Sequence, residues 1–293
     1  MAAYTTTLLL AAIERQSFSP ANQTTFTTAD ILALADEVTK TTILPSILGV
    51  REEYYVFYKD YTITSGTAAY EIPDRAIGLA IREIQIIDSN SNVSNIPRSS
   101  LDQLHNYAPT GSGPDMFYIK GDSIVLVPEP SATSGTLRVH YLLRPASLIE
   151  TSAAAVIDTI NTSTNIVTVT TIPPTWVTGS TFDLIRANGG HRHLDIDLTS
   201  TLISGTSITL PSLPTGLAVG DYIALAGESP VVQMPPDLQS VLATLVAAEM
   251  LLSMNQPSGE KVYARALKSL AAVQDMLTPR VIGEEELIIP DWT

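Results

Sequence analysis

The chain has 293 residues, of which 45% are hydrophobic, so it is long enough for two domains and is not an intrinsically disordered protein. Acidic residues outnumber basic ones by 30 to 16, for a net charge of -14, which argues against a protein that wraps nucleic acid, because phosphate binding depends on lysine and arginine. Because the chain has no cysteine and no apolar run of about 18 residues, we expect no disulfide, no cysteine-ligated zinc, no thiol nucleophile and no membrane-spanning helix.

The first fifty residues predict helices. Thr27 or Thr28 can cap a helix whose first turn contains Asp30, where the helix dipole favours an anion. We expect Pro45 to kink or end this helix and Gly49 to close the segment. A second, shorter helix is predicted over residues 8–15. The apolar residues that share one face of the longer helix are Ile31, Leu34, Ala35 and Val38.

From Tyr54 onward the sequence is typical of strands, because aromatic and β-branched residues replace the helical periodicity. Gly121-Asp122 separates two such runs and predicts a β-hairpin. One or two helical turns are expected over residues 101–107. The predicted strands of this block are 54–58, 61–64, 80–88, 116–120, 123–127 and 136–142.

A second β-rich block covers residues 151–227. Turn sequences such as Asn188-Gly189-Gly190 separate short strands that recur about every ten residues, a spacing typical of a small barrel or sandwich. Its predicted strands are 165–171, 181–186, 195–198, 207–210 and 221–226.

The C-terminal part is predicted to be an αα-hairpin that packs on the N-terminal helix. Pro235-Pro236-Asp237 opens its first helix, and residues 255–259 form the loop. The apolar stripe of the first helix is Leu238, Val241, Leu242, Leu245 and Val246, and that of the second is Tyr263, Leu267, Leu270, Val273 and Leu277.

The predicted fold class is therefore α+β, with a discontinuous helical bundle domain and an inserted β-rich region that includes a second small β-barrel or sandwich. The expected boundaries are 1–53 plus 231–278 for the helical domain, 54–150 for the β-rich domain, 151–230 for the inserted small β domain, and 279–293 for an extended C-terminal arm.

The C-terminal arm joins an acidic run, Glu284-Glu285-Glu286, to an apolar stretch that ends near Trp292. An apolar terminal segment needs a surface against which to dock. Two alternatives stay open: the arm folds back on its own subunit, or it docks on a neighbouring subunit.

The sequence contains no recognisable catalytic motif. Glycine-rich phosphate loops and nucleophile elbows are missing, so we expect no enzyme and no cofactor. The densest set of ligand-type residues is His191, His193, Asp195 and Asp197, which would share one face of a strand if the side chains alternated. A polar strand face beside a hairpin tip explains this set more simply than a metal site does. A metal-dependent hydrolase built on these four residues is one of the less favoured hypotheses.

Three segments carry a resemblance to a known family: residues 70–84 (YEIPDRAIGLAIREI), 117–128 (FYIKGDSIVLVP) and 137–145 (LRVHYLLRP). This pattern, with the helical hairpin at 236–277 and the exit at 278–281, resembles the head-to-tail adaptor (connector) proteins of tailed bacteriophages. The likeness covers residues 25–145 and 235–282, and 151–227 reads as an insertion into it.

The resemblance implies a structural virion protein that is made in the host cytoplasm and assembled in the neck, between head and tail. The implied partners are other copies of the chain in a dodecameric ring, the portal protein, a tail or nozzle protein, and genomic DNA that passes without specific binding; no membrane is implied. A low charged fraction of 16% suits extensive subunit contacts. The residues expected to dock on a subunit or on the portal are Arg280, Val281, Ile288, Ile289 and Trp292.

A function of another class stays open: a binding module whose inserted β domain recognises a cell-surface glycan. The many hydroxyl side chains of residues 151–227 suit sugar binding. However, Trp176 and Tyr222 are the only tryptophan and tyrosine there, so platforms on which a sugar ring could stack are scarce.

Overall fold

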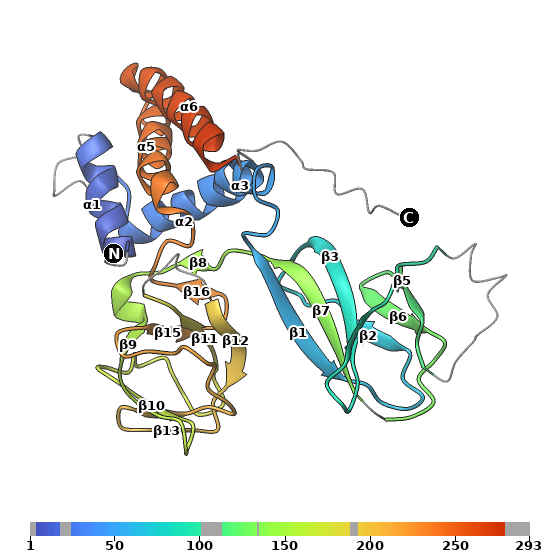
Figure 1. Ribbon diagram of the computed structural model, residues 1–293. Helices are drawn as coiled ribbons and strands as arrows, with labels where there is room; N and C mark the ends of the chain where they lie inside the picture. Colours follow the sequence, from blue (N-terminus) through green and yellow to red (C-terminus); the bar gives the residue numbers. More distant parts are fainter. Residues whose placement is uncertain (1–3, 18–24, 101–112, 134, 188–192, 279–293) are drawn as a thin grey trace, which may run out of the picture. The chain divides into compact units, whose positions relative to one another are not determined.

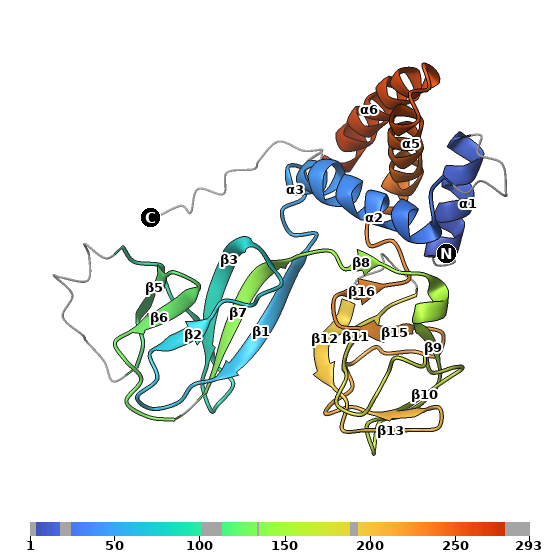
Figure 2. The same cartoon turned by 180° about the vertical axis from the view of Figure 1, so that it is seen from behind.

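The computed structural model describes residues 4–17, 25–100, 113–133, 135–187 and 193–278 (Figure 1). The chain divides into two compact units, one made of residues 1–51 with 145–293 and the other of residues 52–144. The first unit carries helices and a seven-stranded sheet, and the second carries two smaller sheets (Figures 1 and 2). The fold class α+β is confirmed, whereas the four-part division of the chain stays a prediction.

Helix α2 (Thr28–Val38) begins as the sequence indicates. Thr27 is its N-cap: the Thr27 hydroxyl oxygen accepts from the Asp30 N–H at 3.2 Å, and Asp30 accepts from the Thr27 N–H at 2.8 Å. The Thr27 hydroxyl also donates to the Asp30 carboxylate at 2.6 Å, and this bond, together with the one from the Thr27 N–H, holds the pKa of the Asp30 carboxyl below its ordinary value. This reciprocal pair is a capping box, which satisfies two backbone donors that a helix start leaves unbonded.

Pro45 does not end the helical segment. A π-helical turn (Thr39–Ile43) follows α2, and α3 (Leu44–Leu48) contains the proline near its start, where a missing N–H costs least. Gly49 then closes the segment, as predicted.

Replacing Thr27 by alanine should lower the free energy of unfolding by about 1 kcal/mol, because both hydrogen bonds of the capping hydroxyl are lost. Thr28→Ala is the matched control: Thr28 is the first helical residue and is exposed, so its truncation should leave stability nearly unchanged. Urea unfolding followed by circular dichroism measures both. Equal losses in the two variants would contradict the cap.

Helix α5 (Pro236–Ser253) is buried along most of its length because α1 (Thr6–Ser17), α2 and α6 (Ser258–Leu277) all pack against it. All five residues of its predicted stripe are buried, and so are Ala243, Ala247 and Ala248. A helix with partners on several sides is apolar all round.

The predicted stripe of α6 is wrong at Leu267, whose side chain is 40% exposed. The buried positions are instead Gly259, Ala266 and Leu270. A Cβ on Gly259 would lie 2.9 Å from the Leu252 backbone nitrogen, so the close approach of α5 and α6 at their connection requires glycine. Small residues therefore face α5, and the larger Leu267 lies beside the contact.

The second unit contains two antiparallel sheets. The four-stranded sheet has the order β1-β7-β3-β4, and the three-stranded sheet has the order β2-β6-β5. The hairpin predicted at Gly121-Asp122 joins β5 to β6. Alternate residues of β7 are buried, from Leu137 to Leu143. The strands are β1 (Val56–Thr62), β2 (Ala69–Glu71), β3 (Ala76–Ile87), β4 (Val93–Asn95), β5 (Met116–Lys120), β6 (Ser123–Val127) and β7 (Thr136–Leu143).

Two predictions for this unit differ from the structure. The two runs expected at 54–58 and 61–64 form a single strand, β1. Strand β3 begins at Ala76, four residues earlier than predicted. Its first part is irregular: Gly78 and Leu79 have positive φ angles, and the register with β7 shifts between Ala76 and Ile81. This irregularity interrupts the alternation on which the prediction relied. The helical turn expected at 101–107 lies outside the described residues.

The sheet of the first unit has the order β12-β11-β15-β9-β10-β14-β13, and its neighbours pair antiparallel. Its edge strands do not pair with each other in the described part of the chain, so no closed barrel forms there; the finer barrel or sandwich detail stays a prediction. The strands are β9 (Ala155–Asn161), β10 (Ile166–Val169), β11 (Thr181–Ile185), β12 (His193–Thr199), β13 (Leu202–Ser204), β14 (Ser207–Thr209) and β15 (Tyr222–Leu225).

Backbone pairing attaches the helices to this sheet region. β8 (Ser147–Leu148) and β16 (Glu228–Ser229) form a short parallel pair. Asp36 of α2 accepts from the Leu148 N–H at 3.0 Å, and the Thr6 N–H donates to the Pro230 carbonyl at 2.9 Å. Burial raises the pKa of Asp36 although the Leu148 bond opposes this. The chain start and the segment before α5 are therefore held side by side.

Candidate interaction sites

The residues predicted to dock on a subunit or on the portal, Arg280, Val281, Ile288, Ile289 and Trp292, lie outside the described residues. Their role stays a prediction.

The predicted ligand-like strand is β12, and its geometry differs from simple alternation. His193 pairs with Ile185 and Asp195 pairs with Leu184, with two register shifts along the β11–β12 ladder. Asp197 has a φ of 57°, which is unusual for a residue other than glycine. These irregularities remove the strict period of two on which a shared face depends. His191 lies outside the described residues.

Instead, β12 lies beside a buried carboxylate on β11. The Asp183 side chain on β11 is fully buried, and it accepts from the Asp197 N–H at 3.1 Å and from the Gly227 N–H at 3.0 Å. His193 Nδ1 lies 3.7 Å from its Oδ2. Backbone donors therefore replace water around this carboxylate, which is how a buried acid is usually satisfied.

His193 also contacts the segment that leads into α5. Its Nε2 lies 2.8 Å from Gln233 Nε2, and Gln233 Oε1 accepts from the Ala146 N–H at 3.0 Å. Because the Gln233 amide nitrogen donates, His193 Nε2 accepts, which places a hydrogen on the Nδ1 that faces Asp183. The contacts of His193 thus join β11 and β12 to the entry of α5, an arrangement that serves structure.

Among the described residues, no group of three histidine or acidic side chains is arranged to hold a metal ion. In the same part of the chain, no helix combines the length and the apolar character that crossing a membrane needs.

Asp195 makes the stability of this region depend on pH. Burial raises the pKa of the Asp195 carboxyl, and the charges of Asp183 and Asp197 raise it further, although the Ile196 N–H opposes this. The folded state therefore holds this proton more tightly than the unfolded chain. The stability that the protonated Asp195 carboxyl contributes is fully present below pH 3.8, and it is lost as the pH rises through the raised pKa.

The variant Asp195→Asn should therefore raise the free energy of unfolding at neutral pH and change it little below pH 3.8. Asp158→Asn on β9 is the control, because it removes the same charge from an exposed position. Urea unfolding at both pH values measures the effect. An equal gain at both pH values would contradict the explanation.

The aromatic residues weighed for sugar binding are buried to different degrees. Trp176 is 5% exposed, and its ring packs edge-on against Phe182 at 4.8 Å between centroids. Tyr222 is half-buried, and burial raises the pKa of its hydroxyl. A core tryptophan cannot offer the flat, accessible face that stacks on a sugar ring, so Trp176 does not favour the glycan hypothesis.

Two arginines of the second unit, Arg138 and Arg82, have carboxylate partners. Arg138 forms two bonds of 2.8 Å to Asp60 and stacks over Tyr58, and Arg82 bridges Glu52 and Glu53 at 2.9 and 2.8 Å. Such exposed pairs contribute about 0–1 kcal/mol each. They need no external ligand to explain them.

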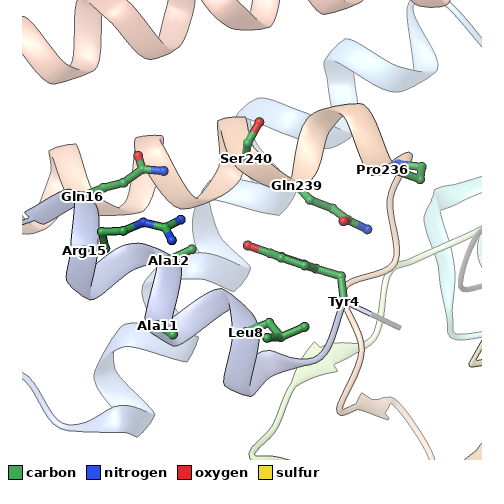
Figure 3. A pocket seen from close by; sticks show the side chains of 9 residues that line it. All are labelled: Tyr4, Leu8, Ala11, Ala12, Arg15, Gln16, Pro236, Gln239 and Ser240. Carbon is green, nitrogen blue, oxygen red and sulfur yellow. The ribbon is translucent and has the colours of Figure 1, made fainter. Parts of the chain in front are cut away.

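A groove of about 370 Å³ lies between α1 and the first turns of α5 (Figure 3). Leu9 and Ile13 of α1 are fully buried, whereas Leu8, which is 49% exposed, belongs to a neighbouring stripe that lines the groove. The lining residues are Tyr4, Leu8, Ala11, Ala12, Arg15, Gln16, Pro236, Gln239 and Ser240.

Tyr4 and Arg15 give the groove its polar character. Figure 3 shows the Tyr4 ring lying between the two helices and Arg15 on α1 farther along the groove. Burial raises the pKa of the Tyr4 hydroxyl, and the Arg15 charge partly opposes this. Because Arg15 is the one charged residue among the described lining residues, the groove suits an apolar partner that carries a carboxylate. No signal in the sequence indicates this site, because its two sides come from segments more than two hundred positions apart, which meet where residues 4–6 pair with 230–232.

The comparisons with known proteins bear on both units. A family model described as SU10 adaptor protein matches residues 21–188, more than half of the 293 residues. The matched range contains α2, α3, the whole second unit and the strands β8 to β11. A search of curated proteins found no match.

Proposed function

This chain belongs to the SU10 adaptor protein family, a family of phage head-to-tail adaptors, and from this membership we propose that it forms a ring joining the portal to the tail and lining the DNA channel. Membership itself assigns the chain a structural role in the virion and places it in the neck, in association with other head and tail components. The resemblance seen in the sequence is thereby confirmed.

The observation that carries the proposal is the family match over residues 21–188. The charge balance supports it: with a net charge of -14, the ring repels the phosphate backbone, so genomic DNA passes without being held. The low charged fraction of 16% supports it too, because charged residues are depleted from the centres of subunit interfaces.

The proposed mechanism is mechanical. The helices dock on the portal and on neighbouring subunits in a dodecameric ring, and the β-rich parts face outward or toward a tail or nozzle protein. The C-terminal arm, with Arg280, Val281, Ile288, Ile289 and Trp292, locks adjacent subunits together. No catalytic step is part of this role.

Density-gradient fractionation of an infected lysate, with peptide mass spectrometry of each fraction, tests the proposal. The chain should sediment with DNA-filled particles at about a dozen copies per particle, as a cyclic ring requires. Peptides of the portal protein provide the internal standard for copy number, and a soluble host enzyme provides the control for carry-over. A chain found only in the soluble fractions would overturn the proposal.

A further inference from the structure

We propose that the groove between α1 and α5 receives the apolar end of the C-terminal arm, residues 287–292, from a neighbouring copy of this chain. This inference rests on the ring proposed above and adds the surface that receives the arm. It commits to an arm from another copy, so an arm from the same chain is an outcome of the test.

The chemistry of the arm matches that of the groove. The groove offers apolar walls from Leu8, Ala11 and Pro236, and its charge is the guanidinium of Arg15. The arm supplies leucine, isoleucine and tryptophan side chains with Asp291 among them, after the acidic run 284–286. An Arg15–Asp291 pair would form while apolar side chains cover Leu8, so both features of the groove find a partner.

The position of α6 favours a neighbouring copy over the same chain. Helix α6 follows α5 after a short connection, and it ends at Leu277, whose carbonyl accepts from Arg51 Nε at 3.2 Å just after α3. Helix α1 and the end of α6 lie on opposite sides of α5 (Figures 1 and 2). The arm therefore starts on one side of the helices, and the groove opens on the other.

Opposite faces are what a ring brings together. In a head-to-tail ring each subunit presents one face to the next subunit and the opposite face to the previous one. An arm that starts beside α6 of one subunit then faces the α1 side of its neighbour. The fifteen residues of the arm, 279–293, span at most about 50 Å when extended.

Disulfide trapping tests the inference cleanly, because the chain has no natural cysteine. Full-length chains that carry Leu8→Cys are mixed with full-length chains that carry Ile289→Cys and a longer tag, assembled, and oxidised. We expect a disulfide-linked heterodimer on a non-reducing gel. Its yield should exceed that of the control by about tenfold, since docking raises the effective concentration of the two thiols.

Glu14→Cys is the matched control, because Glu14 is exposed on α1 but does not line the groove. Gln239→Cys, on the α5 side of the groove, provides a second independent pair with Ile289→Cys.

Arg15→Glu should reduce the heterodimer yield about tenfold, because it places the new carboxylate beside that of Asp291. Arg265→Glu, at an exposed position of α6, should leave the yield unchanged. Thermal unfolding verifies that each variant is folded.

The outcomes separate the two proposals. Heterodimer at control level from both groove positions overturns the inference, and if the chain still sediments with particles the proposed function stands. A disulfide formed only within one chain, in a Leu8→Cys/Ile289→Cys double variant, overturns the neighbouring copy as the source of the arm. A chain absent from particles overturns the proposed function by the separate sedimentation measurement.

Discussion

Deletion of residues 280–293 is expected to leave a folded chain that no longer assembles. The last described turn of α6 stays complete in this variant: the Thr278 N–H donates to the Gln274 carbonyl at 3.0 Å, and Arg51 Nε donates to the Leu277 carbonyl at 3.2 Å. The removed segment contains the apolar residues that are proposed to lock subunits. The fold should therefore persist while the contact between subunits is lost.

Sedimentation velocity of the purified chain and complementation of assembly measure this effect. We expect the midpoint of thermal unfolding to change little and the yield of intact particles to fall below detection. A full-length variant with serine in place of Ile288, Ile289 and Trp292 separates loss of apolar contact from loss of length, and should behave like the deletion. Intact particles from the deleted chain would refute the locking arm.

Phe182→Ala should lower the free energy of unfolding of the first unit by about 3–5 kcal/mol, because a fully buried aromatic ring is replaced by a cavity. Phe182 lies on β11 in a cluster with Trp176 and Leu184, and it is bordered by residues from several strands of the seven-stranded sheet. This loss is a large share of the roughly 5–15 kcal/mol that stabilises a typical domain.

Urea unfolding followed by tryptophan fluorescence suits this measurement, because Trp176 reports on the same cluster. Val177→Ala is the control: Val177 neighbours the tryptophan but is 63% exposed, so its truncation should cost little. A loss below about 1 kcal/mol for Phe182→Ala would show that the cluster repacks around the missing ring.

The contacts of His193 show how a local pattern can leave the chemistry of a site open. The spacing of histidine and aspartate along β12 matches ligands on one strand face, yet the irregular ladder turns Asp197 so that its backbone N–H meets Asp183. His193 is held by Gln233, forty positions along the chain. No property of residues 191–197 alone contains that contact, so the metal hypothesis could be weighed but not decided from the sequence.

The amino-acid sequence was sufficient for those elements that local interactions specify. The Thr27 cap, the hairpin at Gly121-Asp122 and the helices α5 and α6 were predictable because each depends on residues within about four positions of one another. The segments that resemble an adaptor were also sufficient to indicate the family. Such local patterns allow a prediction without knowledge of how distant segments pair.

Only the tertiary structure decided what each surface faces. Leu267 is exposed because Gly259 and Ala266 make the close contact with α5, and Trp176 is buried because distant strands contribute to one cluster. The groove lies where α1 packs on α5, beside the pairing of residues 4–6 with 230–232, more than two hundred positions away. Burial and cavities are set by long-range packing, and hydrophobic periodicity predicts which face of an element is apolar without indicating what will cover it.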